Sequence, residues 1–177
     1  MQRVPMAEFA PDLQMRLESL WGDPPNLYRA LGNQPALVAA WTEFFNSIRN
    51  QSRTPRRLRE IVILRAGQLA RSEYEWAQHL SMARKAGVRD TQIQALSDWR
   101  ASKEFDARER AALALTEAVT AGQMTDEVHA EAKRHFDDGE FVELCLTAAA
   151  YAMVSRMIDA LGIELDPGVK DYSPRLP

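Results

Sequence analysis

The sequence has very little cysteine: Cys145 is the only one in 177 residues. A single thiol cannot form an intrachain disulfide, and it cannot supply the paired thiols of a CxxC redox or zinc site. Cys145 lies in the apolar stretch FVELCLTAAAYAMV, so we expect it to be a buried small hydrophobic residue. The sequence thus offers no dithiol chemistry, and we expect neither a metal nor a bound cofactor.

The chain also lacks an excess of one charge and a long hydrophobic run. Its 22 basic and 25 acidic residues give a net charge of -3, spread without long blocks of one sign. Nucleic acid is therefore not an expected partner. We find no run close to the roughly 18 apolar residues that cross a membrane, and the start MQRVPMAEFAPDLQ lacks the apolar stretch of a signal peptide. These absences predict a cytoplasmic protein with no membrane partner.

Proline is missing from the middle of the chain. Six of the nine prolines fall at or before Pro55 and three at or after Pro167, so residues 56–166 have none. Since proline interrupts helices and no alternating strand pattern is present, the sequence predicts an all-α fold. With 46% hydrophobic residues, the chain is long enough for one domain with a real core.

The helical periodicity is bounded by recognisable caps. Thr54-Pro55, Asp90, Thr125 and the DARE capping box at 106–109 mark helix starts. Glycines are expected to end helices at Gly87, Gly122, Gly139 and Gly162. The predicted helices are 8–20, 26–31, 35–50, 55–71, 73–87, 90–99, 106–121, 125–137 and 139–161.

The helix expected at 55–71 is apolar around most of its circumference, so it should be buried on most sides. Glu60 and Arg65 are then out of place, because a buried charge without a partner costs several kcal/mol. An internal Glu60–Arg65 ion pair that organises the core is one interpretation. A functional site is the other, and Gly67 would allow a neighbouring helix to approach closely near Glu60.

The next helix carries Ser72, Glu75 and His79 along one side, at steps of three and four residues. Glu75 and His79 alone could be an ordinary surface pair. They could equally serve acid/base chemistry, because histidine transfers protons near neutral pH and a neighbouring carboxylate tunes its basicity. His129 and His135, on a highly charged helix, are expected to be solvated.

Glu60, Ser72, Glu75 and His79 follow the spacing E-x11-C-x2-C-x3-H of alkylhydroperoxidase-D-like proteins, with both cysteines replaced. The sequence of this region, RLREIVILRAGQLARSEYEWAQHLSMARKAGV, resembles the carboxymuconolactone decarboxylase family, especially its longer members with an E-Y-E-W-x-x-H segment. The resemblance implies an all-α, alkylhydroperoxidase-D-like helical bundle that forms homo-oligomers, often trimers or hexamers. It divides the chain into an N-terminal helical extension (1–25), a family-like domain (26–165) and a C-terminal tail (166–177).

Peroxidase members of the family use the two cysteines, so the resemblance implies no thiol peroxidase activity here. Decarboxylase members need only a general acid/base and a cation that binds carboxylate. The resemblance therefore favours a cofactor-free lyase or proton-transfer enzyme on a small acidic ring compound, as in aromatic-compound degradation. Its candidate catalytic residues are His79 as acid/base, Glu60 to orient it and Glu75 to tune it; the candidate substrate-binding residues are Tyr74, Arg65 and Ser72.

One alternative is a non-catalytic oligomeric helical protein in which the motif residues only hold the core together. The other is a peroxidase-related antioxidant protein. Tyr151 and Arg156 lie in the last predicted helix, where their polar ends need partners. Either a subunit interface or an active-site pocket would supply them. Convergence of Glu60 and His79 at a pocket with access to solvent would favour the enzyme.

Overall fold

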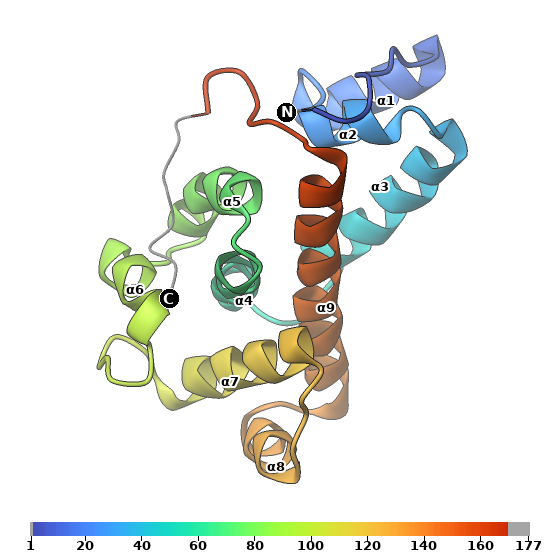
Figure 1. Cartoon of the computed structure of the whole chain (residues 1–177). Helices are drawn as coiled ribbons and strands as arrows, with labels where there is room; N and C mark the ends of the chain where they lie inside the picture. The colour runs from blue at the N-terminus through green and yellow to red at the C-terminus, as the bar shows by residue number, and fades with distance from the viewer. Residues whose placement is uncertain (1, 170–177) are drawn as a thin grey trace.

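The structure is a computed structural model, and it describes residues 2–169. This part of the chain is helical and contains no strand, which confirms the all-α fold (Figure 1). The helices are α1 (Pro11–Trp21), α2 (Asn26–Leu31), α3 (Pro35–Asn50), α4 (Arg56–Leu69), α5 (Glu73–Lys85), α6 (Asp90–Ala95), the 3-10 helix η1 (Leu96–Asp98), α7 (Ala107–Ala121), α8 (Asp126–His135) and α9 (Asp138–Leu161).

The helix starts agree with the expected caps at two of four places. The Thr125 side chain caps α8, and Asp106 and Glu109 form a reciprocal capping box at α7. The other two starts lie one residue away from the expectation. Pro55 is the N-cap residue of α4, without a side-chain hydrogen bond, and Arg89 rather than Asp90 is the N-cap residue of α6.

Glycines with positive φ follow three helices in the way that the sequence predicts. Gly87, with a φ of 91°, lies two residues after the last residue of α5. Gly122 and Gly162 adopt left-handed conformations, with φ of 66° and 64°, directly after α7 and α9. The prediction that Gly139 ends a helix is wrong, because it lies in the first turn of α9. The Asp137 side chain accepts a hydrogen bond from the Glu140 backbone N–H and starts the helix there, so Gly139 follows the cap instead of forming one.

Helix α4 lies at the centre of the fold and packs against α5, α7 and α9 (Figure 1). Every residue from Leu58 to Gln68 is buried, which confirms the prediction that this helix is covered on most sides. Gly67 marks its closest approach to α5: a Cβ atom added there would lie 3.4 Å from the Cβ of Glu75. Glycine therefore keeps the two helices at contact distance beside the motif residues.

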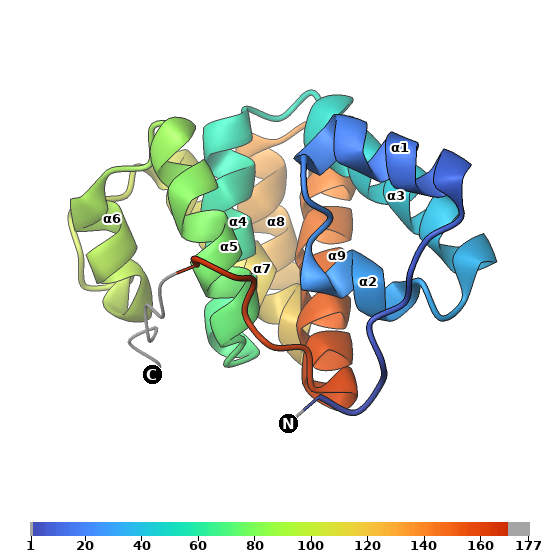
Figure 2. The same ribbon diagram turned by 90° about the horizontal axis from the view of Figure 1, so that it is seen from above.

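Helices α1, α2 and α3 pack over the C-terminal half of α9 (Figure 2). They share one hydrophobic cluster with it, in which Leu17 of α1, Phe45 of α3 and Tyr151 of α9 are almost completely buried. The backbone N–H of Arg3 also donates to the carbonyl of Leu161, 2.9 Å away. The N-terminal extension is thus packed into the same core as the helices that follow it.

Among the described residues, one helix, α9, is long and apolar enough to cross a membrane, and the absence of a membrane partner stays a prediction. The helix has 24 residues, and an 18-residue window within it has a mean hydropathy of 1.4, which suffices by length and composition alone. Half of that segment is buried inside the fold, where α9 packs against α4 and α7. The same composition is typical of the central helix of a globular core.

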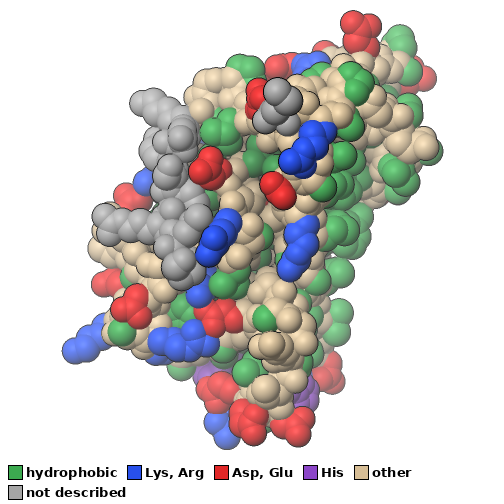
Figure 3. All heavy atoms as spheres, viewed as in Figure 1, with side chains coloured by type: hydrophobic (Ala, Val, Ile, Leu, Met, Phe, Trp, Pro, Cys, Tyr) green, Lys and Arg blue, Asp and Glu red, His purple; other side chains and the backbone are tan. Residues whose placement is uncertain are grey.

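The outer face of α9 carries an exposed apolar stripe, which we define as Val142, Leu146, Ala149 and Met153. Their spacing of four, three and four residues matches the seam of paired helices. Leu37 on α3 is also exposed, at 58%. Figure 3 shows hydrophobic side chains gathered along the right-hand edge of the molecule, where α3 and α9 lie.

We expect this stripe to bind a second copy of the chain, because its spacing suits helix pairing and small Ala149 at its middle permits close approach. Light scattering should give a mass that is a multiple of 20.0 kDa. The double substitution Leu146→Glu with Met153→Glu should lower that mass. Met15→Glu, at another exposed apolar position, is the control; a wild-type monomer at micromolar concentration would contradict the expectation.

Candidate functional site

His79 of α5 lies between two carboxylates. Its Nδ1 is 2.9 Å from Oε2 of Glu60 on α4, and its Nε2 is 3.6 Å from Oε2 of Glu75, one turn earlier on α5. All three side chains are buried. The helical hairpin of α4 and α5 thus brings together the three predicted catalytic residues. Within residues 2–169 no cluster of His, Cys, Asp and Glu is arranged to hold a metal ion.

The Glu60 carboxylate is fully buried but well provided with positive partners. It forms an ion pair with Arg56, one turn earlier on α4, and contacts His79 on its other oxygen. Burial alone would raise the pKa of Glu60, but the combined attraction of His79 and Arg56 outweighs it and lowers the pKa below 4.5. An ionised Glu60 accepts a hydrogen bond from Nδ1–H of His79, which leaves the lone pair on Nε2.

Glu75 has the opposite environment. Burial raises the pKa of its carboxyl above 4.5, and the attraction of His79 and Arg49 does not compensate. The pKa values of the two carboxyl groups beside His79 are therefore shifted in opposite directions. Glu60 holds its charge, and Glu75 retains a proton more readily. Such a separation is typical of sites in which one group orients and the other exchanges a proton.

A small cavity lies beside His79, with a volume of about 30 Å³. This is enough for one or two water molecules. His79 and Glu75 line the cavity and Glu60 does not, so Glu60 supports the imidazole from behind. The remaining walls are largely aromatic and come from α1, α2, α3, α5 and α9: Trp21, Tyr28, Trp41, Phe45, Tyr74 and Tyr151, with Arg49, Gln78 and Met82 among the other lining residues.

An outer groove of about 540 Å³ adjoins this cavity. Four residues line both spaces: Trp21, Tyr28, Arg49 and Met82. These four side chains therefore separate the groove from the cavity that His79 lines. His79 thus lies beside a cavity that shares part of its wall with a surface groove, and Glu60 contacts His79 from outside that cavity.

Tyr151 links the imidazole to the groove. Its ring meets the His79 ring edge to face, with centroids 4.8 Å apart, and its hydroxyl accepts a hydrogen bond from Nε of Arg49 at 3.2 Å. Burial raises the pKa of Tyr151 to about 12, so the hydroxyl keeps its proton near neutral pH. Of the two possibilities for this residue, the structure places it in the pocket.

All three predicted substrate-binding residues have other partners. Tyr74 contributes its ring to the cavity, but its hydroxyl donates to Oδ2 of Asp166 at 3.1 Å. Ser72 caps α5 by accepting from the Glu75 backbone N–H, 3.3 Å away, and does not line the cavity. Asp166 also receives hydrogen bonds from the Gln78 side chain and the Asn26 backbone.

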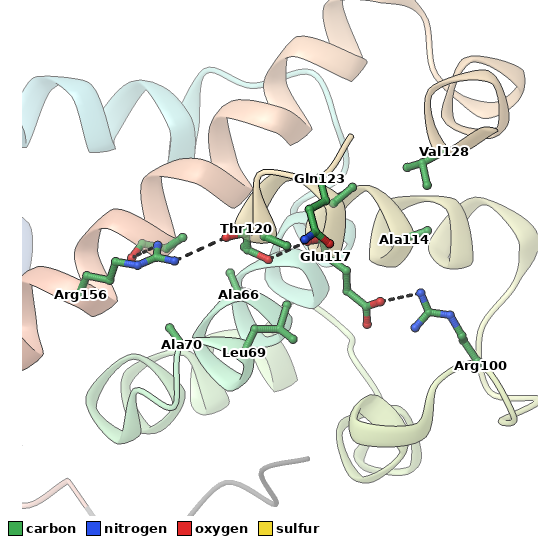
Figure 4. Close-up of a pocket in the computed structure, with 13 residues that line it drawn as sticks. Ala66, Leu69, Ala70, Arg100, Ala114, Glu117, Thr120, Gln123, Val128 and Arg156 are labelled. Carbon is green, nitrogen blue, oxygen red and sulfur yellow. Dashed lines mark hydrogen bonds and ion pairs between the residues drawn. The ribbon is translucent and has the colours of Figure 1, made fainter. Parts of the chain in front are cut away.

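Arg65 lies away from His79, and the suggested Glu60–Arg65 ion pair is not formed. The Arg65 guanidinium binds Glu117 of α7 at 2.5 Å, and Glu117 also binds Arg100 at 2.6 Å. Figure 4 shows Glu117 and Arg100 at a separate groove of about 490 Å³. Arg156 lines that groove and donates to the carbonyls of Ala152 and Thr120.

Several lining residues are not identifiable from the sequence pattern. Trp21, Tyr28, Phe45 and Arg49 lie on α1, α2 and α3, upstream of the motif, and reach the cavity only because these helices pack on α9. Their local pattern indicates only an apolar helix face. Arg49 lies in the last turn of α3, where a cation favourably interacts with the helix C-terminus. Nothing in the sequence therefore distinguishes it from an arginine that only stabilises the helix end.

Residues 35–118 match the model of the carboxymuconolactone decarboxylase family. Over this segment the chain is similar to that family. One relative is the uncharacterized protein YdfG of Bacillus subtilis (strain 168), 29% identical over 115 residues that cover 63% of this chain and 78% of YdfG. The segment that matches the family model contains all of α3, α4 and α5, and so it includes both carboxylates and the histidine of the site.

Solved structures share the fold over nearly the whole chain. A peroxidase-related protein from Ralstonia eutropha JMP134, described as an alkylhydroperoxidase AhpD core, has a TM-score of 0.83 at 16% identity, covering 99% of this chain and 97% of its own. A peroxidase-related protein from Silicibacter sp. TM1040 has a TM-score of 0.81 at 18% identity. The match covers 94% of this chain and 91% of that protein. A variant of the debrominase Bmp8, in complex with 2,3,4-tribromopyrrole, has a TM-score of 0.78 at 20% identity. The match covers 96% of this chain and 93% of Bmp8.

The two carboxylates should respond oppositely to neutralisation. Because the folded-state pKa of Glu60 lies below 4.5, its stabilising effect is present above that pH and is lost as the pH falls through the folded-state pKa. Because the folded-state pKa of Glu75 lies above 4.5, its favourable contribution is complete below that pH and is lost as the pH rises through the folded-state pKa.

At about pH 7 we expect Glu60→Gln to lower the free energy of unfolding by about 2–3 kcal/mol, since Arg56 and His79 lose their counter-charge. Glu75→Gln should raise it by about 1 kcal/mol, and this gain should fade toward pH 4.5. Urea unfolding at both pH values measures the differences. Shifts of the same sign for the two variants at pH 7 would contradict the assignment.

Proposed function

We propose that this chain is a cofactor-independent enzyme of the lyase type that transfers a proton on a small acidic ring compound, with His79 as the acid/base. The observation that supports this is the position of His79: its Nδ1 lies 2.9 Å from buried Glu60, and the residue lines an aromatic cavity together with Glu75. A histidine held in one tautomer beside an apolar cavity is suited to general acid/base catalysis.

Each residue has a distinct role in the proposed reaction. Glu60 accepts from Nδ1–H and fixes the imidazole, so that Nε2 exchanges the proton. In a decarboxylation, the bond from the ring carbon to the carboxylate breaks, CO2 leaves, and the electron pair is delocalised into a carbonyl of the ring. The protonated His79 then gives its Nε2 proton to the carbon. Glu75, 3.6 Å from Nε2, can return a proton to the imidazole.

The cavity is lined by aromatic side chains, which suit a flat ring once the wall has moved to admit one. Phe45 and Tyr151 are almost completely buried there, and Trp41 stacks at a tilt on Phe45 with centroids 4.4 Å apart. Aromatic walls favour planar ligands and exclude water, which strengthens electrostatic interactions inside the site. The debrominase among the structural neighbours was solved with 2,3,4-tribromopyrrole, a small planar ring, and this supports the same ligand shape for the present chain.

His79→Gln should lower turnover by roughly a hundredfold to ten-thousandfold, the range for a positioned proton-transfer group. The assay offers a panel of unsaturated ring carboxylic acids and lactone acids, and measures CO2 release and deuterium incorporation from solvent. The matched control is His129→Gln, at an exposed position on α8. Undiminished activity of folded His79→Gln on a confirmed substrate would remove the assigned role, and a panel without turnover would favour the structural alternative.

Thiol peroxidase activity is not supported by the site. Ser72 and Glu75 occupy the two cysteine positions, and Ser72 caps a helix outside the cavity. Cys145 lies half-buried on α9 among residues of a different hydrophobic cluster, and burial raises the pKa of its thiol. A thiol with a raised pKa is a poor nucleophile, and no second thiol can resolve a sulfenic acid.

The natural protein should therefore show no dithiol-dependent consumption of hydroperoxide above the background without enzyme. The measurement follows hydroperoxide loss with a dithiol reductant for the natural protein and for Cys145→Ser. Both should be inactive. Robust turnover of the natural protein that disappears in Cys145→Ser would show that Cys145 is a reactive thiol, and would favour a peroxidase.

A further inference from the structure

Arg49 occupies the wall between the outer groove and the cavity, and it lines both spaces. It lies in the last turn of α3. Its Nε donates to the Tyr151 hydroxyl at 3.2 Å, and its guanidinium carbon lies 4.9 Å from the ring centre of Trp21 and 5.4 Å from that of Phe45. Its neighbours are thus neutral and aromatic: the Tyr151 hydroxyl, Tyr28 as a second hydrogen-bond partner, and the rings of Trp21 and Phe45.

The charge of Arg49 has no carboxylate partner of its own within residues 2–169. The other arginine of the groove, Arg56, is different, because it is paired with Glu60. Glu75 is near enough for Arg49 to lower its pKa, yet burial still keeps that pKa raised. A half-buried guanidinium whose neighbours are ring faces and hydroxyls keeps its capacity to bind an anion.

We propose that Arg49 binds the carboxylate of the substrate, which is therefore a planar ring that carries a single carboxylate. This inference rests on the proposed function for its catalytic meaning, and names the ligand class of the same site. A guanidinium presents parallel N–H groups that match the two oxygens of a carboxylate, a geometry that the point charge of a lysine lacks.

The geometry of Tyr151 connects this anion site to the acid/base. Arg49 contacts the Tyr151 hydroxyl, and the Tyr151 ring lies against the His79 ring. A carboxylate on the guanidinium thus places its attached ring alongside Tyr151 and toward His79. One carboxylate is specified because Arg49 is the cavity-lining cation, while Arg56 of the groove is neutralised by Glu60.

The volumes of the groove and the cavity determine how a ligand can reach His79. The groove, at about 540 Å³, accommodates a small ring, whereas the cavity of about 30 Å³ does not until its wall moves. Met82 belongs to that shared wall, and the flexible, unbranched methionine side chain can move without a backbone change. Arg49 therefore captures the anion at the boundary, and the ring displaces the side chains in front of His79.

Benzoate and its neutral isostere benzamide test the proposal by calorimetric titration. The natural protein should bind benzoate about tenfold to a hundredfold more tightly than benzamide, the range for hydrogen bonds to a charged group. Arg49→Met should abolish this preference, and Arg49→Lys should retain part of it. Arg100→Met is the matched control, because Arg100 also stacks on a tryptophan, Trp99, but at the other groove.

The proposal is overturned if benzoate shows no saturable binding, if it binds no better than benzamide, or if folded Arg49→Met keeps the preference. Should Arg49→Met fail to fold by circular dichroism, Arg49→Gln replaces it, since glutamine can still donate to Tyr151. His79→Gln separates this inference from the proposed function: it should lose turnover and keep the benzoate preference. A benzoate preference without turnover on any ring acid would refute only the proposed lyase.

Discussion

The site depends on the buried charge of Glu60. A carboxylate that is fully enclosed on a central helix must be given positive partners, or the fold loses several kcal/mol. One partner, Arg56, comes from the same helix, but the other, His79, can be supplied only if α5 packs at a fixed register along α4. Gly67 makes that register possible by removing a side chain where the two helices touch.

The same arrangement explains why two glutamates around one imidazole behave differently. Glu60 has a guanidinium in direct contact, whereas Glu75 faces an aromatic cavity and the opposite edge of the ring. Burial acts on both, and the difference in pKa direction comes from the nearby positive charges. A single histidine thereby contacts a carboxylate that keeps its charge on one side and a carboxyl group that retains its proton more readily on the other.

Much of this could be predicted from the sequence because it depends on local spacing. The absence of proline between residues 56 and 166 and the helical periodicity predict the all-α fold, and the steps between Glu60, Glu75 and His79 suit facing positions on a hairpin. Capping was less predictable: Gly139 follows Asp137, which competes to start a helix at the same place.

The aromatic walls and Arg49 could not be predicted, because tertiary packing alone brings them to His79. Trp21 is 58 positions away in the sequence, and nothing in α1 indicates that its last residue lines a cavity. Arg65 shows the converse. Its sequence position beside Glu60 suggested a common role, but on a helix buried on all sides neighbouring charges point to different partners, here Glu117 of α7.

Asp166 has a consequence for how the site is assembled during synthesis. Its carboxylate joins the backbone of Asn26 to the side chains of Tyr74 and Gln78, so it ties together segments 88 to 140 residues apart. The hairpin of α4 and α5 can form as soon as it leaves the ribosome, since its contacts are close in sequence. The rim of the cavity is complete only with residue 166, so a growing chain contains Glu60, Glu75 and His79 long before the contacts that close the rim can form.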